Sequence, residues 1–439
     1  MLYERWCQIA AGNRNEIALH DLASRRGWTF NELRAAGEVR SVGDVSWVYP
    51  QGQSPEFILD VLAGWRSGKI VCPLEPGQTR PSVPSPPASC VHLKTTSATT
   101  GTPRLVAFTA AQLAADADNI VATMGLRADW PNLGVISMAH SYGFSNLVLP
   151  LLLHGIPLIL APTPLPEVVR RAATDVPAVT LAAVPALWRA WHEASAIPTA
   201  VRLAISAGAP LPLGLEQAIL VNSGLKIHNF YGSTECGGIA YDDSEVVREE
   251  EGLAGRPMEN VTLSVKNDGC LGVCGANVGE TYWPERDEAL GDGCFQTRDL
   301  AELRDGKVFL VGRAGDSINI AGRKVAPETI EAVLLQHVAI RCCVVFGAPE
   351  RETDRNDRIV ACVEAKPALQ VEELRQFVLA RLPAWQVPRE WWFVDSLAAN
   401  QRGKVSRREW RQRFLQGRKK GQPGSVAIYR LANCVKANP

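Results

Sequence analysis

Residues 312–331 read GRAGDSINIAGRKVAPETIE, and this stretch decides more about the fold than any other part of the sequence. Three glycines surround Asp316, so the backbone there can adopt conformations that other residues rarely reach. Pro327 and Glu328 then suit the first turn of a helix, because proline has no N–H to leave unpaired and an acidic side chain is stabilised at that end. We therefore expect a glycine-rich turn at Asp316 and a helix over 328–336.

Four further segments accompany this stretch, and the order of all five along the chain is informative. They are TTSATTGTPR (95–104), YGSTE (231–235), FQTRD (295–299) and NQRGKVSR (400–407). Together the five segments resemble the adenylate-forming superfamily, which includes acyl-CoA synthetases, peptide-synthetase adenylation domains and luciferases. One such motif would be weak evidence, because turns rich in Gly, Thr and Ser are common. Five in order, across roughly residues 28–408, are strong evidence.

The length and the hydrophobic pattern predict an α/β protein with more than one domain. A chain of 439 residues exceeds the size of a single hydrophobic core. Short apolar runs at 45–48, 134–138, 157–160 and 203–206 alternate with helical patterns at 165–173 and 213–221, which indicates buried, mainly parallel strands. We expect a large α/β domain with a β-rich subdomain over 1–315, a small mobile α+β domain over 316–415, and a tail over 416–439.

The composition favours a small-molecule partner and a cytoplasmic location. Lysine plus arginine and aspartate plus glutamate each number 46, which argues against binding to nucleic acid or anionic lipid mainly through charge. The longest apolar stretch, 146–162, is too short and too interrupted to cross a membrane and predicts a buried helix followed by a strand. The eleven cysteines lack the spacing of a disulfide scaffold, so we expect reduced thiols, with Cys270 and Cys274 as β-strand residues and not metal ligands.

The segment over 95–104 has the composition of a phosphate-binding loop. Small hydroxylic residues and a glycine allow N–H and O–H groups to converge on phosphate oxygens. The resemblance implies that this loop holds the β and γ phosphates of ATP, with Ala98 in place of the usual glycine and arginine in place of the usual lysine. The expected ATP-binding residues here are Thr96, Ser97, Thr99, Thr100, Gly101 and Arg104.

The segment 231–235 follows an apolar run and is expected at the end of a strand, where open α/β sheets bind ligands. The resemblance makes Tyr231 and Gly232 part of the adenine site, Thr234 a phosphate contact, and Glu235 the Mg²⁺ ligand and a catalytic residue. A carboxylate oxygen is a hard ligand that suits magnesium shared with phosphates. Gly208, in the segment 206–210, is expected to line the nucleotide and acyl pocket.

The remaining expected residues come from the later segments. The resemblance implies that Asp299 and Arg313 bind the ribose and that Lys404 enters the site during adenylation, where its ammonium group stabilises developing charge. Asp316 is the expected hinge. Gly322 is expected to lie beside the pantetheine arm of CoA or of a carrier protein.

The identity of the acid is the least defined part of the prediction. His140 lies where acyl- and aryl-activating members carry an aromatic gate, and we expect it to be a catalytic residue. No aspartate or glutamate occurs between Asp129 and Glu167, where amino-acid-activating members usually hold the substrate ammonium, so we predict a fatty or aryl acid. The predicted enzyme is an AMP-forming ligase that uses ATP, Mg²⁺ and a pantetheine thiol of CoA or an acyl carrier protein. The alternatives are a stand-alone amino-acid adenylation domain and a non-catalytic nucleotide-binding relative.

Overall fold

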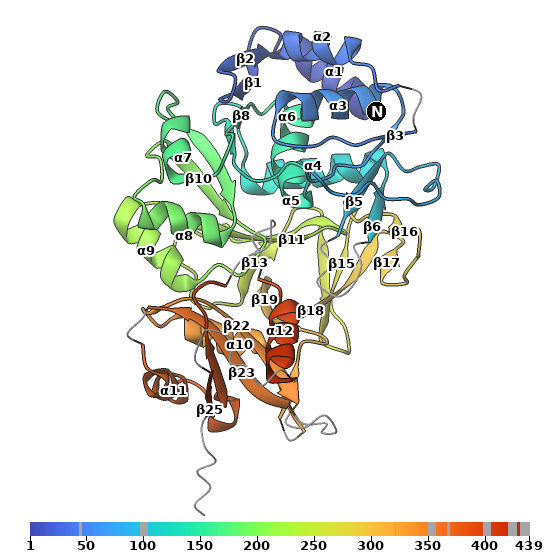
Figure 1. Ribbon diagram of the computed structural model, residues 1–439. Coiled ribbons are helices and arrows are strands. Elements are labelled where there is room, and N and C mark those ends of the chain that lie inside the picture. Colours follow the sequence, from blue (N-terminus) through green and yellow to red (C-terminus); the bar gives the residue numbers. More distant parts are fainter. Residues whose placement is uncertain are drawn as a thin grey trace, which may run out of the picture. The chain divides into compact units, whose positions relative to one another are not determined.

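The computed structural model describes residues 1–43, 46–96, 104–320, 322–349, 357–366, 369–397, 405–419 and 428–430 (Figure 1). Contacts between residues divide the chain into two compact units. Unit 1 comprises Met1–Leu211, Leu215–Thr297 and Leu303–Phe309, and unit 2 comprises Pro212–Gly214, Arg298–Glu302 and Leu310–Pro439. The domain boundary that we expect at Asp316 remains a prediction.

A long mixed sheet lies mostly in unit 1, in the order β14-β15-β18-β19-β13-β12-β11-β10-β9-β7-β8-β1-β2. Residues 298–302 of β18 and 310–313 of β19 belong to unit 2. Adjacent strands are parallel from β1 to β11, through the pairs β1–β8, β8–β7, β7–β9, β9–β10 and β10–β11. The strands of this part are β1 (Ile17–Asp21), β2 (Arg26–Thr29), β7 (Asn132–Gly134), β8 (Leu158–Leu160), β9 (Val179–Ala183), β10 (Val201–Ser206) and β11 (Ile227–Ser233). The predicted α/β architecture with buried parallel strands is confirmed.

The chain after Glu235 supplies the antiparallel part of the same sheet. Its strands are β12 (Gly237–Tyr241), β13 (Leu253–Pro257), β14 (Thr262–Val265), β15 (Cys270–Cys274), β17 (Leu290–Gly291), β18 (Cys294–Arg304) and β19 (Lys307–Arg313). Gly269 and Gly306 follow the ends of β14 and β18 with positive φ, a conformation that glycine adopts without steric cost. In both hairpins the chain therefore reverses at a glycine.

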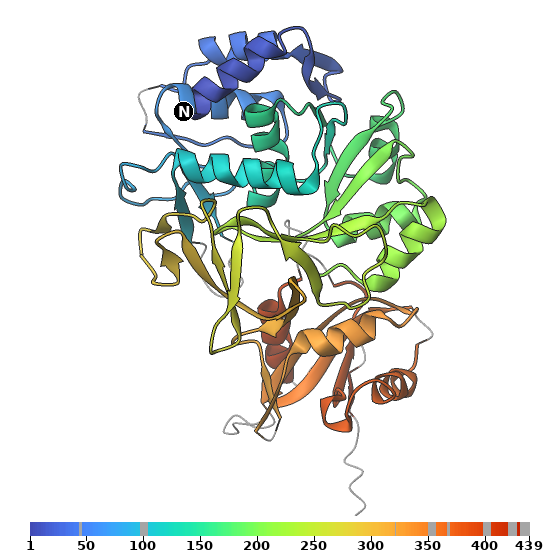
Figure 2. The ribbon, with the colours of Figure 1, turned by 180° about the vertical axis from the view of Figure 1, so that it is seen from behind.

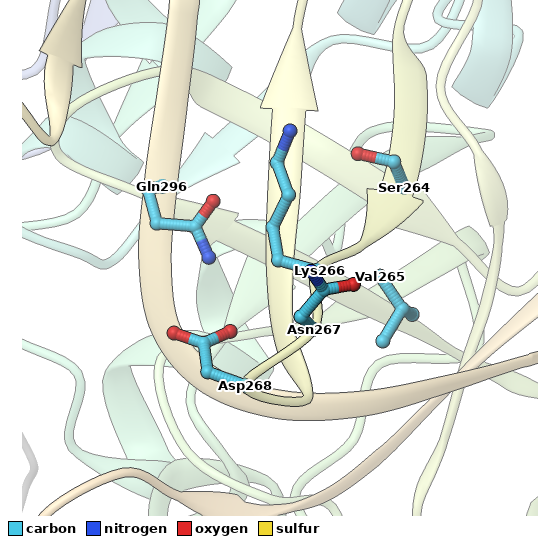
Figure 3. A pocket seen from close by; sticks show the side chains of 6 residues that line it. All are labelled: Ser264, Val265, Lys266, Asn267, Asp268 and Gln296. Atoms are coloured by element: carbon cyan, nitrogen blue, oxygen red, sulfur yellow. The ribbon is translucent and has the colours of Figure 1, made fainter.

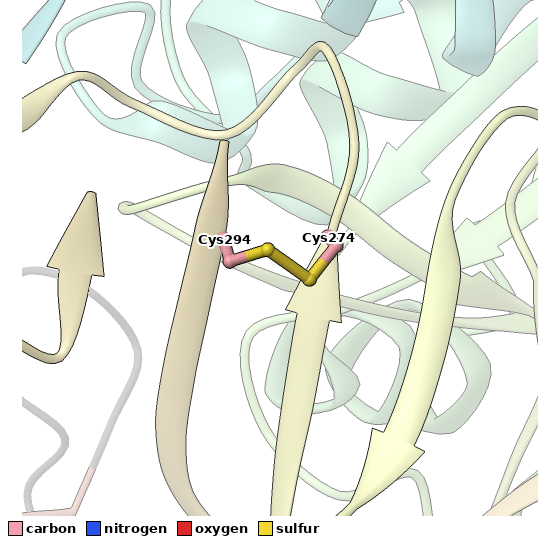
Figure 4. Close-up of a disulfide and its surroundings, with 2 residues drawn as sticks. All are labelled: Cys274 and Cys294. Atoms are coloured by element: carbon pink, nitrogen blue, oxygen red, sulfur yellow. A yellow bond between two sulfur atoms is a disulfide. The ribbon is translucent and has the colours of Figure 1, made fainter. Parts of the chain in front are cut away.

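One pair of cysteines corrects the expectation that all the thiols are reduced. Cys274 at the end of β15 and Cys294 at the start of β18 form a disulfide (Figure 4). This bond could not be predicted from the sequence, because the two residues are 20 positions apart and become neighbours only when the strands pair. Cys270 is buried in β15 and takes no part in this disulfide, as expected for a β-strand residue.

A second sheet of unit 1, in the order β16-β6-β5-β4-β3, holds the predicted phosphate loop. The loop lies between the antiparallel strands β5 (His92–Thr95) and β6 (Leu105–Phe108). The other strands are β3 (Trp47–Val48), β4 (Ile70–Val71) and β16 (Thr281–Trp283). This hairpin fixes the two ends of the loop.

The helices of unit 1 begin where sequence signals place them. Pro55 opens α3 (Pro55–Arg66), and Thr109 forms a capping box with Gln112 at the start of α4 (Ala110–Met124), which Figure 2 shows from behind. The segment 146–162 contains the end of the π-helix η1 (Phe144–Val148), then α6 (Leu149–His154) and β8, as predicted. The other helices are α1 (Leu2–Gly12), α2 (Phe30–Val39), α5 (Ser141–Gly143), α7 (Pro166–Ala172), α8 (Pro185–Glu193) and α9 (Leu213–Ser223).

Unit 2 is a four-stranded sheet, β22-β23-β24-β25, with helices on both faces. Residues of α10 (Pro327–Leu335) and α11 (Val371–Leu379) pack in a core on one face, and Trp410 and Phe414 of α12 (Arg407–Lys419) pack on the other (Figures 1 and 2). The remaining elements are β20 (Ile318–Ile320), β21 (Arg323–Val325), β22 (Ile340–Pro349), β23 (Asp357–Ala365), η2 (Ala384–Gln386), β24 (Glu390–Phe393) and β25 (Ile428–Arg430).

Two further observations concern the ends of the expected elements. The tail was expected to be loop-like, but Ile428–Arg430 pair with β24 as an antiparallel strand, since an exposed strand edge offers N–H and C=O groups to any neighbouring segment. Among the residues that the structure describes, no helix is long and apolar enough to cross a membrane.

Candidate active site

The ends of the predicted phosphate loop are held together by two hydrogen bonds. The Thr96 N–H donates to the Arg104 carbonyl at 2.8 Å, and the Arg104 N–H donates to the Thr96 hydroxyl at 2.9 Å. These bonds continue the β5–β6 ladder by one step, so the loop begins and ends at a fixed point. Ser97, Thr99, Thr100 and Gly101 lie outside the described residues.

The Arg104 side chain reaches from the loop to the segment that follows β16. Its guanidinium group pairs with Asp287 at 2.8 Å, and its central carbon lies 3.5 Å from the centre of the Tyr282 ring. A guanidinium group stacked on an aromatic face retains N–H groups at its edge. These two contacts therefore fix the position of the Arg104 guanidinium group.

Tyr282 links Arg104 to Glu235. The Tyr282 hydroxyl donates a hydrogen bond of 2.9 Å to Oε1 of Glu235. Burial, together with the adjacent Glu235 carboxylate, raises the pKa of this hydroxyl, so it keeps its proton and remains a donor. No role for Tyr282 could be predicted from the sequence, because it lies 47 residues from Glu235 and belongs to none of the five motifs.

Glu235 lies in the turn of the β11–β12 hairpin. Its N–H donates to the Ser233 hydroxyl at 3.2 Å, which orients the turn. Among the described residues, no hydrogen bond reaches its Oε2 atom, so one hard oxygen of a half-buried carboxylate is available. That donor suits a magnesium ion whose other ligands are phosphate oxygens and water.

The position of the 231–235 motif differs in part from the expectation. Tyr231 and Gly232 are not beyond the strand but inside β11, where they pair with β12, and only Thr234 and Glu235 lie in the turn. The antiparallel partner extends the strand past the point where a parallel strand would end. A Cβ atom on Gly232 would lie 2.5 Å from the Gly237 carbonyl oxygen, so this position needs glycine for close packing.

Gly208 follows β10 with a φ of 86°, the left-handed region that glycine favours. A Cβ atom there would also lie 3.3 Å from a methyl group of Val184. The turn that was expected to line the pocket is therefore shaped by glycine.

His140 stands just before α5 and has a partner that the sequence did not reveal. Its Nε2 atom lies 2.9 Å from Oε1 of Glu75, and the Ser137 hydroxyl donates to the same oxygen at 2.5 Å. Tyr142, two residues on, packs against Phe230 of β11 with ring centres 5.9 Å apart. The His140 segment is thus next to the strand that carries Tyr231, and it brings a carboxylate with it.

The residues expected at the ribose lie in unit 2 and contact each other. Nε of Arg313 is 3.1 Å from Oδ1 of Asp299, across the neighbouring strands β19 and β18. Arg298 is exposed and does not displace this carboxylate; its carbonyl accepts a hydrogen bond from the Ala314 N–H.

The expected hinge residue belongs to a charged cluster. Asp316 pairs with Arg407 at 2.6 Å, and the same guanidinium group contacts Glu328 at 2.8 Å and Glu331 at 3.0 Å. Burial is the largest cause of a raised pKa at Glu328, and Glu331 adds to it while Arg407 opposes it. Lys404, three residues before Arg407 in the sequence, lies outside the described residues.

Gly322 lies in the turn between β20 and β21, and Asn319 lies in β20. The Gly322 N–H donates to the Asn319 side-chain oxygen at 3.0 Å, and Gly322 has a φ of 85° with open space at its Cβ position. The Asn319 side chain therefore caps this turn from β20.

Comparison with known proteins places these residues in a family. The model for AMP-binding enzymes matches residues 73–283, and the model for the C-terminal domain of AMP-binding enzymes matches residues 329–404. A probable 2-succinylbenzoate–CoA ligase from Mycobacterium tuberculosis is 30% identical over 338 residues, which cover 73% of this chain and 83% of that protein. The chain belongs to the AMP-binding enzyme family. The predicted superfamily is thereby confirmed, as is the class of AMP-forming CoA ligases.

Further members of the AMP-binding family support the same class and fold. A feruloyl-CoA synthase from Amycolatopsis sp is 28% identical over 340 residues, covering 73% of this chain and 69% of that one. The structure of o-succinylbenzoate CoA synthetase from Bacillus subtilis with its acyl-adenylate intermediate has a TM-score of 0.80 at 21% identity, covering 92% and 97% of the two chains. The same enzyme with ATP and a magnesium ion has a TM-score of 0.77 at 22% identity, covering 92% and 98%.

The predicted site residues of this AMP-binding enzyme fall in both units. Unit 1 holds Thr96, Arg104, His140, Gly208, Tyr231, Gly232, Thr234 and Glu235, and unit 2 holds Asp299, Arg313, Asp316 and Gly322. A surface hollow at the β14–β15 hairpin contains none of these residues (Figure 3); it is lined by Ser264, Val265, Lys266, Asn267, Asp268 and Gln296.

Proposed function

We propose that this enzyme joins an aromatic carboxylic acid to CoA through an acyl-adenylate. Within the family fold, the observation that carries the proposal is the chain of contacts Arg104–Tyr282–Glu235, which connects the end of the phosphate loop to a carboxylate with one available oxygen. The ferulate and succinylbenzoate named for the relatives contain an aromatic ring, which favours an aryl over a fatty acid.

The reaction has two balanced steps. The substrate carboxylate attacks the α-phosphorus of ATP, an oxygen–phosphorus bond forms, and pyrophosphate leaves. The thiolate of CoA then attacks the acyl carbon, a thioester forms, and AMP leaves with the bonding electron pair. Both steps build negative charge on oxygen, so positively charged and N–H groups fixed in advance accelerate them.

The chain's own groups divide these tasks. Thr96 and Arg104 fix the loop that would bind the β and γ phosphates, and Lys404 is proposed to stabilise charge in the first step. Asp299, with Arg313 beside it, would hold the ribose hydroxyls through its carboxylate. Asp316 is proposed as the hinge between the two steps, and Gly322 as the place where the pantetheine arm passes.

Magnesium fits the available donor set. Glu235 would hold the ion through one oxygen while Tyr282 fixes the other. When bound, the ion would neutralise phosphate charge and orient the phosphates.

The test is acid-dependent exchange between ATP and pyrophosphate, followed by a thioester assay with CoA and with a phosphopantetheinylated carrier protein. We expect exchange with aryl acids, product with CoA, and loss of exchange in Lys404→Ala. Lys266→Ala is the matched control, since it removes an exposed lysine from the β14–β15 hairpin. Exchange with fatty acids alone would contradict the aryl assignment. ATP binding without exchange for any acid would favour the non-catalytic relative.

Glu75 favours a second candidate, the activation of an acid that carries an amino group. The segment between Asp129 and Glu167 contains no acidic residue, but Glu75, which follows β4, contacts His140 and supplies a carboxylate there. A partly buried carboxylate such as that of Glu75, whose side chain is 20% exposed, can hold a substrate ammonium group. If exchange occurs with amino acids and is lost in Glu75→Gln, this second function replaces the first.

A further inference from the structure

Unit 1 contains a buried charged cluster between β5, which leads to Thr96, and β12, which follows Glu235. Lys94 Nζ is 3.3 Å from Oδ2 of Asp116 and 3.1 Å from the Ser145 hydroxyl, which itself donates to Oδ2 at 2.5 Å. The Lys94 and Asp116 side chains are 2% and 1% exposed. Burial and the charge of Lys94 lower the pKa of the fully buried His92, so His92 stays neutral and Asp116 balances the lysine.

Asp116 also contacts the hairpin that carries Glu235. Its Oδ1 atom accepts a hydrogen bond of 3.2 Å from the Gly238 N–H. A Cβ atom on Gly237 would lie 2.0 Å from the same oxygen, and Gly237 has a φ of 66°. The backbone immediately after Glu235 is therefore shaped around the Asp116 carboxylate.

The cluster joins two segments that must act on the same nucleotide. Lys94 lies in β5, two residues before Thr96, and Gly238 lies in β12, three residues after Glu235. Asn277 holds the same hairpin from another segment, through bonds of 2.6 Å to the Cys236 carbonyl and 3.2 Å to the Gly238 carbonyl. The strand that enters the phosphate loop and the turn that presents the magnesium ligand are thus linked through one ion pair.

A gain in stability does not by itself account for such a pair. Replacing a buried ion pair with apolar groups of similar size is often neutral or stabilising, because desolvation offsets the attraction between the charges. An ion pair with directional hydrogen bonds does, however, define the relative position of the segments it joins more closely than apolar contacts can.

We propose that Lys94 and Asp116 are positioning residues that set the separation between the phosphate loop and the Glu235 carboxylate, and so the affinity for magnesium-bound ATP. The proposal rests on the proposed function of this site. It assigns no contact between either side chain and the substrate. Its effect should appear in the KM for ATP and in the magnesium dependence.

The experiment compares Lys94→Met, Asp116→Asn and the double variant with the wild-type enzyme. Both single variants leave one charge buried without its partner and should lower the melting temperature. The double variant removes both charges at similar volume and should recover much of the stability. Circular dichroism and thermal unfolding establish which variants fold.

The deciding readouts are the KM for ATP at several magnesium concentrations and calorimetric binding of a non-hydrolysable ATP analogue. We expect the folded double variant to keep a KM raised about tenfold, because displacements of about 1 Å can cost up to about 100-fold in rate. Gly237→Ala should give the same signature, since it displaces the hairpin from Asp116. A folded double variant with the KM and magnesium dependence of the wild type would overturn the proposal.

The outcome also separates this inference from the proposed function. A wild-type protein that binds the ATP analogue but shows no exchange contradicts the ligase assignment, and calorimetry with the variants still tests the positioning role. A wild-type protein that binds no ATP analogue contradicts both.

Discussion

The cluster around Asp116 in unit 1 and the cluster around Arg407 in unit 2 differ in burial and in charge balance. In the first, one cation faces one anion, and both side chains are at most 2% exposed. In the second, Arg407 is 20% exposed and faces Asp316, Glu328 and Glu331, so negative charge is in excess. Matched charges in a dry environment suit a fixed geometry. Exchangeable partners near water suit a segment that rearranges, as we propose for the hinge at Asp316.

The largest expected effect comes from removing one partner of the buried pair. Asp116→Ala leaves the Lys94 ammonium group buried without a counter-charge, and we expect the free energy of unfolding to fall by about 3–5 kcal/mol. Urea titration measures the change. Glu250→Ala is the control, because it breaks an ion pair with Arg304 that is about half exposed, and its stability should match the wild type. Similar losses in the free energy of unfolding of the two variants would contradict the conclusion that the buried ion pair matters more than the exposed one.

Arg407→Ala should have a smaller effect. It leaves three carboxylates close together but partly in contact with water, so we expect a loss of about 1–2 kcal/mol in the free energy of unfolding. Added salt should reduce this loss by screening the carboxylates, whereas the loss in Asp116→Ala should be nearly independent of salt. Unfolding at low and high salt tests both statements. Equal salt dependence in the two variants would contradict the comparison.

Tyr282→Phe tests the hydrogen bond between Tyr282 and the half-buried Glu235 carboxylate. The variant removes the hydroxyl that donates to Glu235 but retains the ring under Arg104. We expect kcat/KM to fall about threefold to tenfold, which corresponds to about 1 kcal/mol, the typical net contribution of one hydrogen bond. The measurement is pyrophosphate exchange as a function of magnesium, with Tyr3→Phe as the control far along the chain from every predicted site residue. An unchanged magnesium dependence would show that Tyr282 does not orient Glu235.

The smallest effect concerns Glu328 and pH. Its pKa is raised above the ordinary value of 4.5, so between that value and the raised pKa the folded state binds more protons than the unfolded state. The free energy of unfolding therefore falls as pH rises through this window. Glu328→Gln removes this slope and should be more stable than the wild type above it, by less than about 1 kcal/mol. Urea titrations from pH 4 to pH 7 would contradict this if the two proteins changed in parallel.

The sequence by itself determined the family and the α/β class, and the site residues that it predicts stay a prediction. Those conclusions depend on local features: glycine and hydroxylic residues in motifs, proline at helix starts, and apolar runs that match buried strands. Thr96, Arg104, Glu235 and Asp299 can be predicted as site residues because motif spacing is a property of the chain and does not require knowledge of what packs nearby.

Only the tertiary structure decided the partners of these residues. Tyr282 next to Glu235, Glu75 next to His140, and the bond between Cys274 and Cys294 all join positions that are distant in sequence. The same holds for Asp116 of α4, whose contacts with Lys94 of β5 and Gly238 of β12 cannot be predicted from its own segment. Charge balance and burial depend on every segment that surrounds a group, and so they arise only when the sheets and helices have assembled.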